Sequence, residues 1–147
     1  MNLKQLRKFC ADESDPRPQI RKPFTQGNYT YATNAHIIIR VPKIRGVKVG
    51  VSPKVEDVGD WKQEGRWNIG KYFPNTKLER CPHCGADNAK VSTCGVEIGV
   101  NKIQNKYLDL LNTLPGCQYI PARLNRPIPF VFQGGCGYVM TILTERK

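Results

Sequence analysis

One run constrains the fold of this chain more than any other: Tyr29-Thr-Tyr-Ala-Thr-Asn-Ala-His-Ile-Ile-Ile-Arg-Val-Pro42. Aromatic and β-branched residues fill both of its halves, and such residues favour β-strands. The pattern predicts two short strands joined by a tight turn over Thr33-Asn34-Ala35-His36. Asn34 tolerates the left-handed conformation that such turns need, and Pro42 ends the second strand. The run therefore predicts a β-hairpin.

The residues before this hairpin predict a short helix and one more strand. Residues 2–11 are expected to form an amphipathic helix, because apolar residues recur there at helical spacing. These apolar residues are Leu3, Leu6, Phe9 and Cys10. Turn formers dominate residues 12–18, and residues 19–24 alternate as a strand does. The N-terminal part is therefore expected to be a helix followed by a three-stranded antiparallel meander.

The C-terminal part predicts a second helix followed by strands. Asn101 is expected to cap this helix with Gln104 as its reciprocal partner, and Pro115-Gly116 is expected to end it. Its expected buried stripe is Ile103, Tyr107, Leu110, Leu111 and Leu114. Strands are expected over residues 117–120, 128–133 and 137–143, with Gly134-Gly135 as the turn between the last two. The predicted fold class is α+β, with two helices packed on antiparallel sheet.

The middle of the chain lacks periodicity. At 147 residues the chain is expected to be a single domain, 1–147, with an irregular insertion over residues 43–95. Basic residues alternate in this insertion with Trp61, Trp67, Tyr72 and Phe73. Such a composition suits binding to single-stranded nucleic acid, but aromatic residues also anchor long loops onto a core. The anchoring role is the preferred interpretation.

The charge of the chain favours polyanionic partners. Lys and Arg number 23 against 12 Asp and Glu, which gives a net charge of +11. The sequence has no apolar run long enough to cross a bilayer, and its first residues lack the features of a signal peptide. A cytoplasmic location is therefore expected, with the six Cys reduced or metal-bound.

Three segments resemble parts of one domain of the bacterial DNA polymerase sliding clamp (the beta clamp). They are Tyr31-Ala-Thr-Asn-Ala-His36, Asn105-Lys-Tyr-Leu-Asp-Leu-Leu111 and Ile128-Pro-Phe-Val-Phe-Gln-Gly-Gly-Cys-Gly-Tyr-Val-Met140. The chain is also similar to small single-domain phage and prophage proteins that carry a Cys-rich insertion in a clamp-like domain. This similarity implies that the cytoplasm in question is that of a bacterial host. Two departures are Asn34, where the clamp usually has Asp, and Thr141-Ile142, where it usually has Pro-Met.

The resemblance implies a surface for DNA. In a clamp domain both helices face DNA, so it implies that basic residues of the two helices contact phosphates without reading sequence. The implied residues are Lys4, Arg7, Lys8, Lys102 and Lys106. Outward-facing lysines are also what any amphipathic helix shows. A ring around DNA needs about six such domains, so one domain would have to form a homo-oligomer or give up encirclement.

Cys81-Pro-His-Cys84-Gly85 is the sharpest chemical motif, because two closely spaced thiolates on a tight turn suit tetrahedral zinc. Cys81, Cys84 and Cys94 are the predicted zinc ligands. The sequence leaves the fourth ligand open: it would be His83, Cys10, Cys117 or Cys136, or it would come from a second chain. Without a fourth ligand the motif would be a structural turn.

The order Cys-Pro-His-Cys, found here at residues 81–84, also occurs in the active sites of some thiol oxidoreductases, where the first Cys begins a helix. Here Gly85 and Asp87-Asn88 follow at once and disfavour a helix. We find no other catalytic pattern, so the chain is predicted not to be an enzyme. The first hypothesis is a phage-type accessory protein of DNA metabolism that binds nucleic acid. The alternative is a phage-encoded inhibitor that binds a host protein complex, either the replisome or a defence system such as CRISPR.

Overall fold

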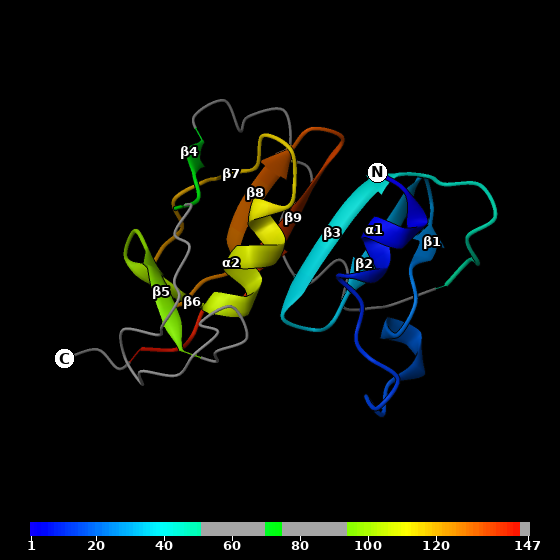
Figure 1. Ribbon diagram of the computed structural model, residues 1–147, viewed down its shortest axis with the longest axis horizontal. Coiled ribbons are helices and arrows are strands. Elements are labelled where there is room, and N and C mark those ends of the chain that lie inside the picture. Colours follow the sequence, from blue (N-terminus) through cyan, green and yellow to red (C-terminus); the bar gives the residue numbers. More distant parts are fainter. Residues whose placement is uncertain (51–69, 75–93, 145–147) are drawn as a thin grey trace. The chain divides into compact units, whose positions relative to one another are not determined.

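Figure 1 shows the computed structural model, which describes residues 1–50, 70–74 and 94–144. These residues form two α-helices and mostly antiparallel strands, so the predicted α+β class is confirmed. The chain divides into two compact units, Met1–Asn68 with Gly134–Tyr138 and Ile69–Gln133 with Val139–Lys147. We call them the first unit and the second unit. The single domain over 1–147 stays a prediction.

In the first unit a helix precedes an antiparallel meander, as the sequence predicts. The elements are α1 (Leu3–Arg7), the 3₁₀ helix η1 (Pro18–Ile20), β1 (Phe24–Gln26), β2 (Tyr29–Thr33), β3 (Ile37–Pro42) and β9 (Gly135–Val139). The strand order is β1-β2-β3-β9. Tyr31 of β2 lies opposite Phe24 of β1 and Arg40 of β3. The second strand of the C-terminal hairpin therefore joins the sheet that the N-terminal meander begins.

One face of this sheet holds an aromatic cluster. Phe24, Tyr31, Ile38 and Tyr138 are buried together there, and the rings of Phe24 and Tyr31 stack with centroids 5.6 Å apart. Partly buried Tyr29 packs against the cluster. Stacked aromatic pairs contribute about 0.5–1.5 kcal/mol beyond the area that they bury. The cluster joins side chains from β1, β2, β3 and β9.

The opposite face of the sheet, here called the helix face, carries buried residues of alternate strand positions. They are Thr25, Thr30, Ala32, Ile39 and Val41. α1 contacts β2. Leu6 of α1 and Phe9, two residues beyond its end, are 0% and 1% exposed, and neither belongs to the aromatic cluster. α1 therefore covers the helix face.

The turn of the first hairpin corrects one detail of the prediction. The left-handed residue is Ala35, with φ of 76°, and not Asn34. Asn34 acts through its side chain, since its Oδ1 accepts the N–H of His36 at 2.9 Å and of Ile37 at 3.0 Å. Thr33 Oγ1 also accepts the N–H of Ala35 at 3.0 Å. Side-chain hydrogen bonds thus hold a non-glycine residue in a strained conformation.

This strain gives a testable prediction. We expect Ala35→Gly to raise the free energy of unfolding by about 0.5–1 kcal/mol, because glycine adopts a positive φ without a Cβ penalty. Equilibrium unfolding in urea measures the change. The matched control is Ala32→Gly, which removes a fully buried methyl group from β2 and should destabilise. Equal losses for both substitutions would contradict the role assigned to this turn.

Two N-terminal elements are shorter than predicted. The helix expected over 2–11 is the five-residue α1, and the strand expected over 19–24 is replaced by η1 and β1. Pro18 occupies the start of η1, where its missing N–H costs nothing and its fixed φ suits a helical turn. The alternation that predicted a strand there was wrong.

The second unit combines a small sheet, a hairpin and a helix. Its elements are β4 (Lys71–Tyr72), β5 (Gly95–Ile98), β6 (Asn101–Gln104), α2 (Asn105–Asn112), β7 (Gln118–Tyr119) and β8 (Ile128–Phe132). The strand order is β8-β7-β4, and β5 pairs with β6 alone. α2 contacts both β5 and β6. β4 lies inside the range that was expected to be irregular, 43–95.

The predicted start of the second helix is wrong. Asn101 does not cap a helix but begins β6, and α2 begins at Asn105 after Gln104, whose side chain makes no capping hydrogen bond. Gly99, with φ of 63°, allows the tight turn from β5 into β6. Burial of Asn101 and Ile103 then alternates as in a strand. Local turn formation therefore prevailed over the capping pattern.

Most of the remaining C-terminal prediction agrees with the structure. The turn between the last two strands lies at Gln133-Gly134, one residue before the predicted Gly134-Gly135, because Gly135 already belongs to β9. Tyr107 and Leu111 of α2 and Leu114 just beyond it are buried, whereas Leu110 is half-buried. The helix ends before Gly116, whose φ is 62°. The three strands predicted for residues 117–143 correspond to β7, β8 and β9, each within a few residues of its expected range.

Phe73 has the anchoring role that we preferred for the aromatic residues of the middle region. It is 5% exposed, and its ring centroid lies 5.0 Å from that of Tyr119 and 6.4 Å from that of Phe130. Its neighbour Tyr72 is instead 69% exposed. Trp61 and Trp67 lie outside the described residues.

Candidate nucleic-acid interface

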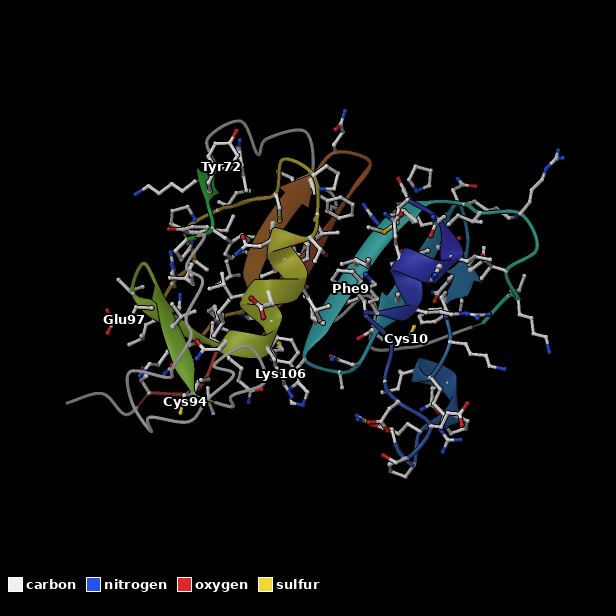
Figure 2. The ribbon with its side chains drawn as sticks, in the orientation of Figure 1. Phe9, Cys10, Tyr72, Cys94, Glu97 and Lys106 are labelled. Atoms are coloured by element: carbon white, nitrogen blue, oxygen red, sulfur yellow. The ribbon has the colours of Figure 1, made fainter. Side chains whose placement is uncertain are left out.

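α1 presents three basic side chains because its two ends and its apolar face are fixed. Asn2 and Gln5 form a reciprocal capping box, with N–H to side-chain oxygen distances of 2.9 Å in both directions. Leu6 and Phe9 are buried, and Figure 2 shows Phe9 between α1 and β3. The remaining side of the helix and its C-terminal end carry Lys4, Arg7 and Lys8, all exposed. The prediction that they point to solvent is confirmed.

A second basic segment, residues 43–50, follows β3 and is fixed at its start. The N–H of Lys43 donates to the carbonyl oxygen of Asn28 at 3.1 Å. The N–H of Ile44 donates to Thr30 Oγ1 at 2.9 Å. Because the Thr30 side chain lies on the helix face, this segment begins on the sheet face that α1 covers.

The same segment is also fixed at its end. The N–H of Thr25 donates to the carbonyl oxygen of Lys48, and the N–H of Gly50 donates to the carbonyl oxygen of Thr25, both at 2.9 Å. Val49 thereby forms a parallel bridge beside β1. The segment exposes three basic side chains: Lys43, Arg45 and Lys48. Three backbone–backbone hydrogen bonds and one to the Thr30 hydroxyl therefore fix the backbone that carries these three basic residues.

The six residues Lys4, Arg7, Lys8, Lys43, Arg45 and Lys48 are called the basic surface below. Residues 1–50 contain ten Lys or Arg and three Asp or Glu, so they supply +7 of the net charge of +11. None of the six has an ion-pair partner among the described residues, where the single ion pair joins Arg17 to Asp15. Exposed, unpaired cations at this density attract phosphates.

The three acidic residues of the segment 1–50 lie together in one turn, and two of them are engaged there. The Ser14 side chain and its N–H donate to Asp12, which lowers the pKa of that carboxyl. Hydrogen bonds from Arg17, with Nη2 at 2.8 Å, lower the pKa of Asp15 to about 2. Glu13 is exposed beside them. The carboxylates of Asp12 and Asp15 are therefore bound within their own turn.

The five residues predicted to contact DNA are divided between the units. Lys4, Arg7 and Lys8 belong to the first unit, whereas Lys102 and Lys106 are half-buried residues of the second. Lys102 lies on β6 and not on a helix, so its predicted helical position is wrong. Lys106 does lie on α2, with Nζ 5.0 Å from the ring centroid of Tyr107 (Figure 2).

Sequence reasoning missed the part of the basic surface that follows β3. The sequence analysis assigned Lys43, Arg45 and Lys48 to an irregular insertion. In the structure the Thr30 hydroxyl and the backbone of Thr25 hold this segment beside the sheet. Such a contact joins residues far apart in sequence, and composition alone does not encode it.

The predicted zinc ligands lie mostly beyond the described residues. Those beyond are Cys81 and Cys84, together with the candidate fourth ligand His83. Cys94 is half-buried and directly precedes β5 (Figure 2). Its carbonyl oxygen accepts the N–H of Asn105 at 2.9 Å. Among the described residues, no group of three or more His, Cys, Asp or Glu side chains could hold a metal ion. The zinc site stays a prediction.

Burial raises the pKa of two of the candidate fourth ligands. It raises the pKa of the Cys10 thiol to about 11, against a smaller opposing effect of the Thr33 N–H and the Arg7 charge. Burial also raises the pKa of Cys117 to about 12. Cys136 is buried as well, on β9.

Compared with protein-family models, curated proteins and solved structures, the chain matches none of them. No helix among the described residues is long and apolar enough to span a membrane.

Proposed function

We propose that this chain is a non-enzymatic accessory protein of DNA metabolism, of the phage type, that binds nucleic acid without reading its sequence. The observation that carries the proposal is the basic surface of the first unit, six exposed cations on α1 and on the fixed segment after β3. Lysine and arginine side chains that neutralise phosphates bind any sequence and release counterions on binding.

The fold that we propose for this role is a variant of one sliding-clamp domain. The order of α1, an antiparallel meander, a connecting region, α2 and then β7, β8 and β9 supports it, as does the place of β9 beside β3. The β5–β6 hairpin directly before α2 is an addition that the sequence resemblance did not suggest. A chain with a single such domain would encircle DNA only as an oligomer, which sedimentation with and without an oligonucleotide tests.

The proposal predicts strong salt dependence and no sequence preference. With six phosphates neutralised, the logarithm of the affinity for duplex DNA should fall with the logarithm of salt concentration with a slope of about −5. Fluorescence anisotropy with two duplexes and two single strands of unrelated sequence measures it. We expect the two sequences of each kind to bind within about threefold of each other. Absence of binding to every oligonucleotide at about 50 mM salt would refute the proposed function.

A further inference from the structure

Both ends of the basic segment after β3, residues 43–50, are held by the β1–β2 hairpin. The start of the segment binds the carbonyl oxygen of Asn28 and the hydroxyl of Thr30. Its end binds the backbone N–H and the carbonyl oxygen of Thr25. Between these two ends the segment turns at Arg45-Gly46, where φ of the glycine is 82°. The segment is therefore a loop that is fixed at both ends on one hairpin.

A pair of buried hydroxyl groups lies beneath the start of this loop. Thr25 and Thr30 are directly opposite each other in the pairing of β1 with β2, and their Oγ1 atoms are 3.1 Å apart. Thr30 Oγ1 also accepts the N–H of Ile44 at 2.9 Å. A hydroxyl group offers one donor and two acceptor positions, so Thr30 can serve both partners at once. The pair therefore joins the interior of the sheet to the basic segment.

These two hydroxyl groups are out of reach of any ligand. The side chains of Thr25 and Thr30 are 1% and 0% exposed, and both lie on the helix face. Any effect of Thr30 on binding must therefore pass through the segment that its hydroxyl holds. A segment that is fixed before binding does not have to be ordered when the ligand binds, and this saving in entropy strengthens binding.

We propose that Thr30, with Thr25 as its partner, is a positioning residue for nucleic-acid binding. Its hydroxyl fixes the backbone from which Lys43, Arg45 and Lys48 reach the phosphates. The inference rests on the proposed function and adds to it a residue that the nucleic acid does not touch. Thr30→Val nearly keeps the shape of the side chain but removes the hydroxyl, so the N–H of Ile44 loses its acceptor. All charges of the segment are retained in this variant.

The test is the affinity of the full chain for a duplex oligonucleotide, measured by fluorescence anisotropy at about 50 mM salt. Thr30→Val should weaken binding about tenfold, because the segment must then be ordered on binding. Thr30→Ser keeps the hydroxyl and should bind within about twofold of the wild-type chain.

The matched control is Thr33→Val, the same substitution on the same strand. Thr33 is also buried, and its hydroxyl donates to the carbonyl oxygen of Ile37 at 2.8 Å and accepts the N–H of Ala35 at 3.0 Å. This hydroxyl therefore holds the first hairpin turn and not the basic segment. Thr33→Val should bind duplex DNA within about twofold of the wild-type chain, although it also loses two hydrogen bonds.

Two alanine backgrounds show through which residues Thr30 acts. When the three basic residues of the segment 43–50 are already alanine, Thr30→Val should change the affinity by less than about twofold. When the three basic residues at positions 4–8 are alanine instead, the loss of about tenfold should remain. A purely structural effect, such as a loosened sheet or a displaced α1, would weaken binding in both backgrounds.

Amide hydrogen exchange of the unbound chain gives a measurement that needs no ligand. The N–H of Ile44 should exchange at least about tenfold faster in Thr30→Val than in the wild-type chain or in Thr30→Ser. The inference is wrong if this exchange is unchanged, if the wild-type chain and Thr30→Val bind DNA equally, if Thr33→Val causes the same loss, or if the loss persists without the basic residues of the segment. If the wild-type chain binds no oligonucleotide, the proposed function fails and the inference fails with it.

Discussion

Replacing all six residues of the basic surface with alanine is expected to weaken binding to duplex DNA by about 100-fold or more at moderate salt. Each lost phosphate contact removes one released counterion, so the slope against salt should fall toward zero by about 0.9 per residue. Anisotropy titrations at several salt concentrations measure both quantities. The six side chains are exposed, so the substitutions should change the free energy of unfolding little.

Two triple variants resolve the contributions within this surface. Lys4, Arg7 and Lys8 form one set and Lys43, Arg45 and Lys48 the other, and each set should account for about half of the change in slope. The control is a variant of equal charge in which Lys71, Arg123 and Arg126 of the second unit are replaced with alanine. We expect it to change affinity by less than about threefold, because these three residues do not belong to the basic surface and loss of net charge alone is screened by salt. Equal losses in the control would contradict a localised interface.

The largest effect on stability is expected for Phe9→Ala, which should lower the free energy of unfolding by about 3–5 kcal/mol. Phe9 is 1% exposed, and α1 is only five residues long, so its position depends on Leu6 and Phe9. An isolated helix of this length is unstable in water. Unfolding in guanidinium chloride, followed by circular dichroism, measures the change.

The control for this substitution is Lys8→Ala, next to it in sequence but exposed. It should change stability by less than about 0.5 kcal/mol. Phe9→Leu should retain most of the stability, because it keeps an apolar side chain in the same place. A cost below about 1 kcal/mol for Phe9→Ala would mean that α1 does not pack on the helix face as described.

The sequence predicted the elements whose signals are local. The β-branched and aromatic side chains of the segment 29–42 predicted the first hairpin. The spacing of Tyr107, Leu111 and Leu114 predicted which side of α2 is buried. The turn residue was misplaced because Asn34 stabilises the turn through its side chain, which allows Ala35 to take the positive φ. The residue types of this segment identified the turn, but they did not show which residue takes the positive φ and which one accepts the hydrogen bonds.

Elements that depend on distant contacts were not predicted. The capping pattern at Asn101 was misleading because this side chain binds the loop at residues 122–125, more than twenty positions away. The segment after β3 was read as irregular because the hydroxyl and backbone groups that hold it belong to Thr25 and Thr30. These contacts are polar and join distant residues, so they cannot be predicted from the spacing of apolar residues along the sequence.

The most direct test of the proposed interface is a lysine-acetylation footprint of the full chain with and without a duplex oligonucleotide, read by mass spectrometry. The account predicts that DNA protects Lys4, Lys8, Lys43 and Lys48, whereas Lys71 of the second unit reacts equally in both samples. Protection of Lys71 with continued reaction of the four first-unit lysines would contradict it.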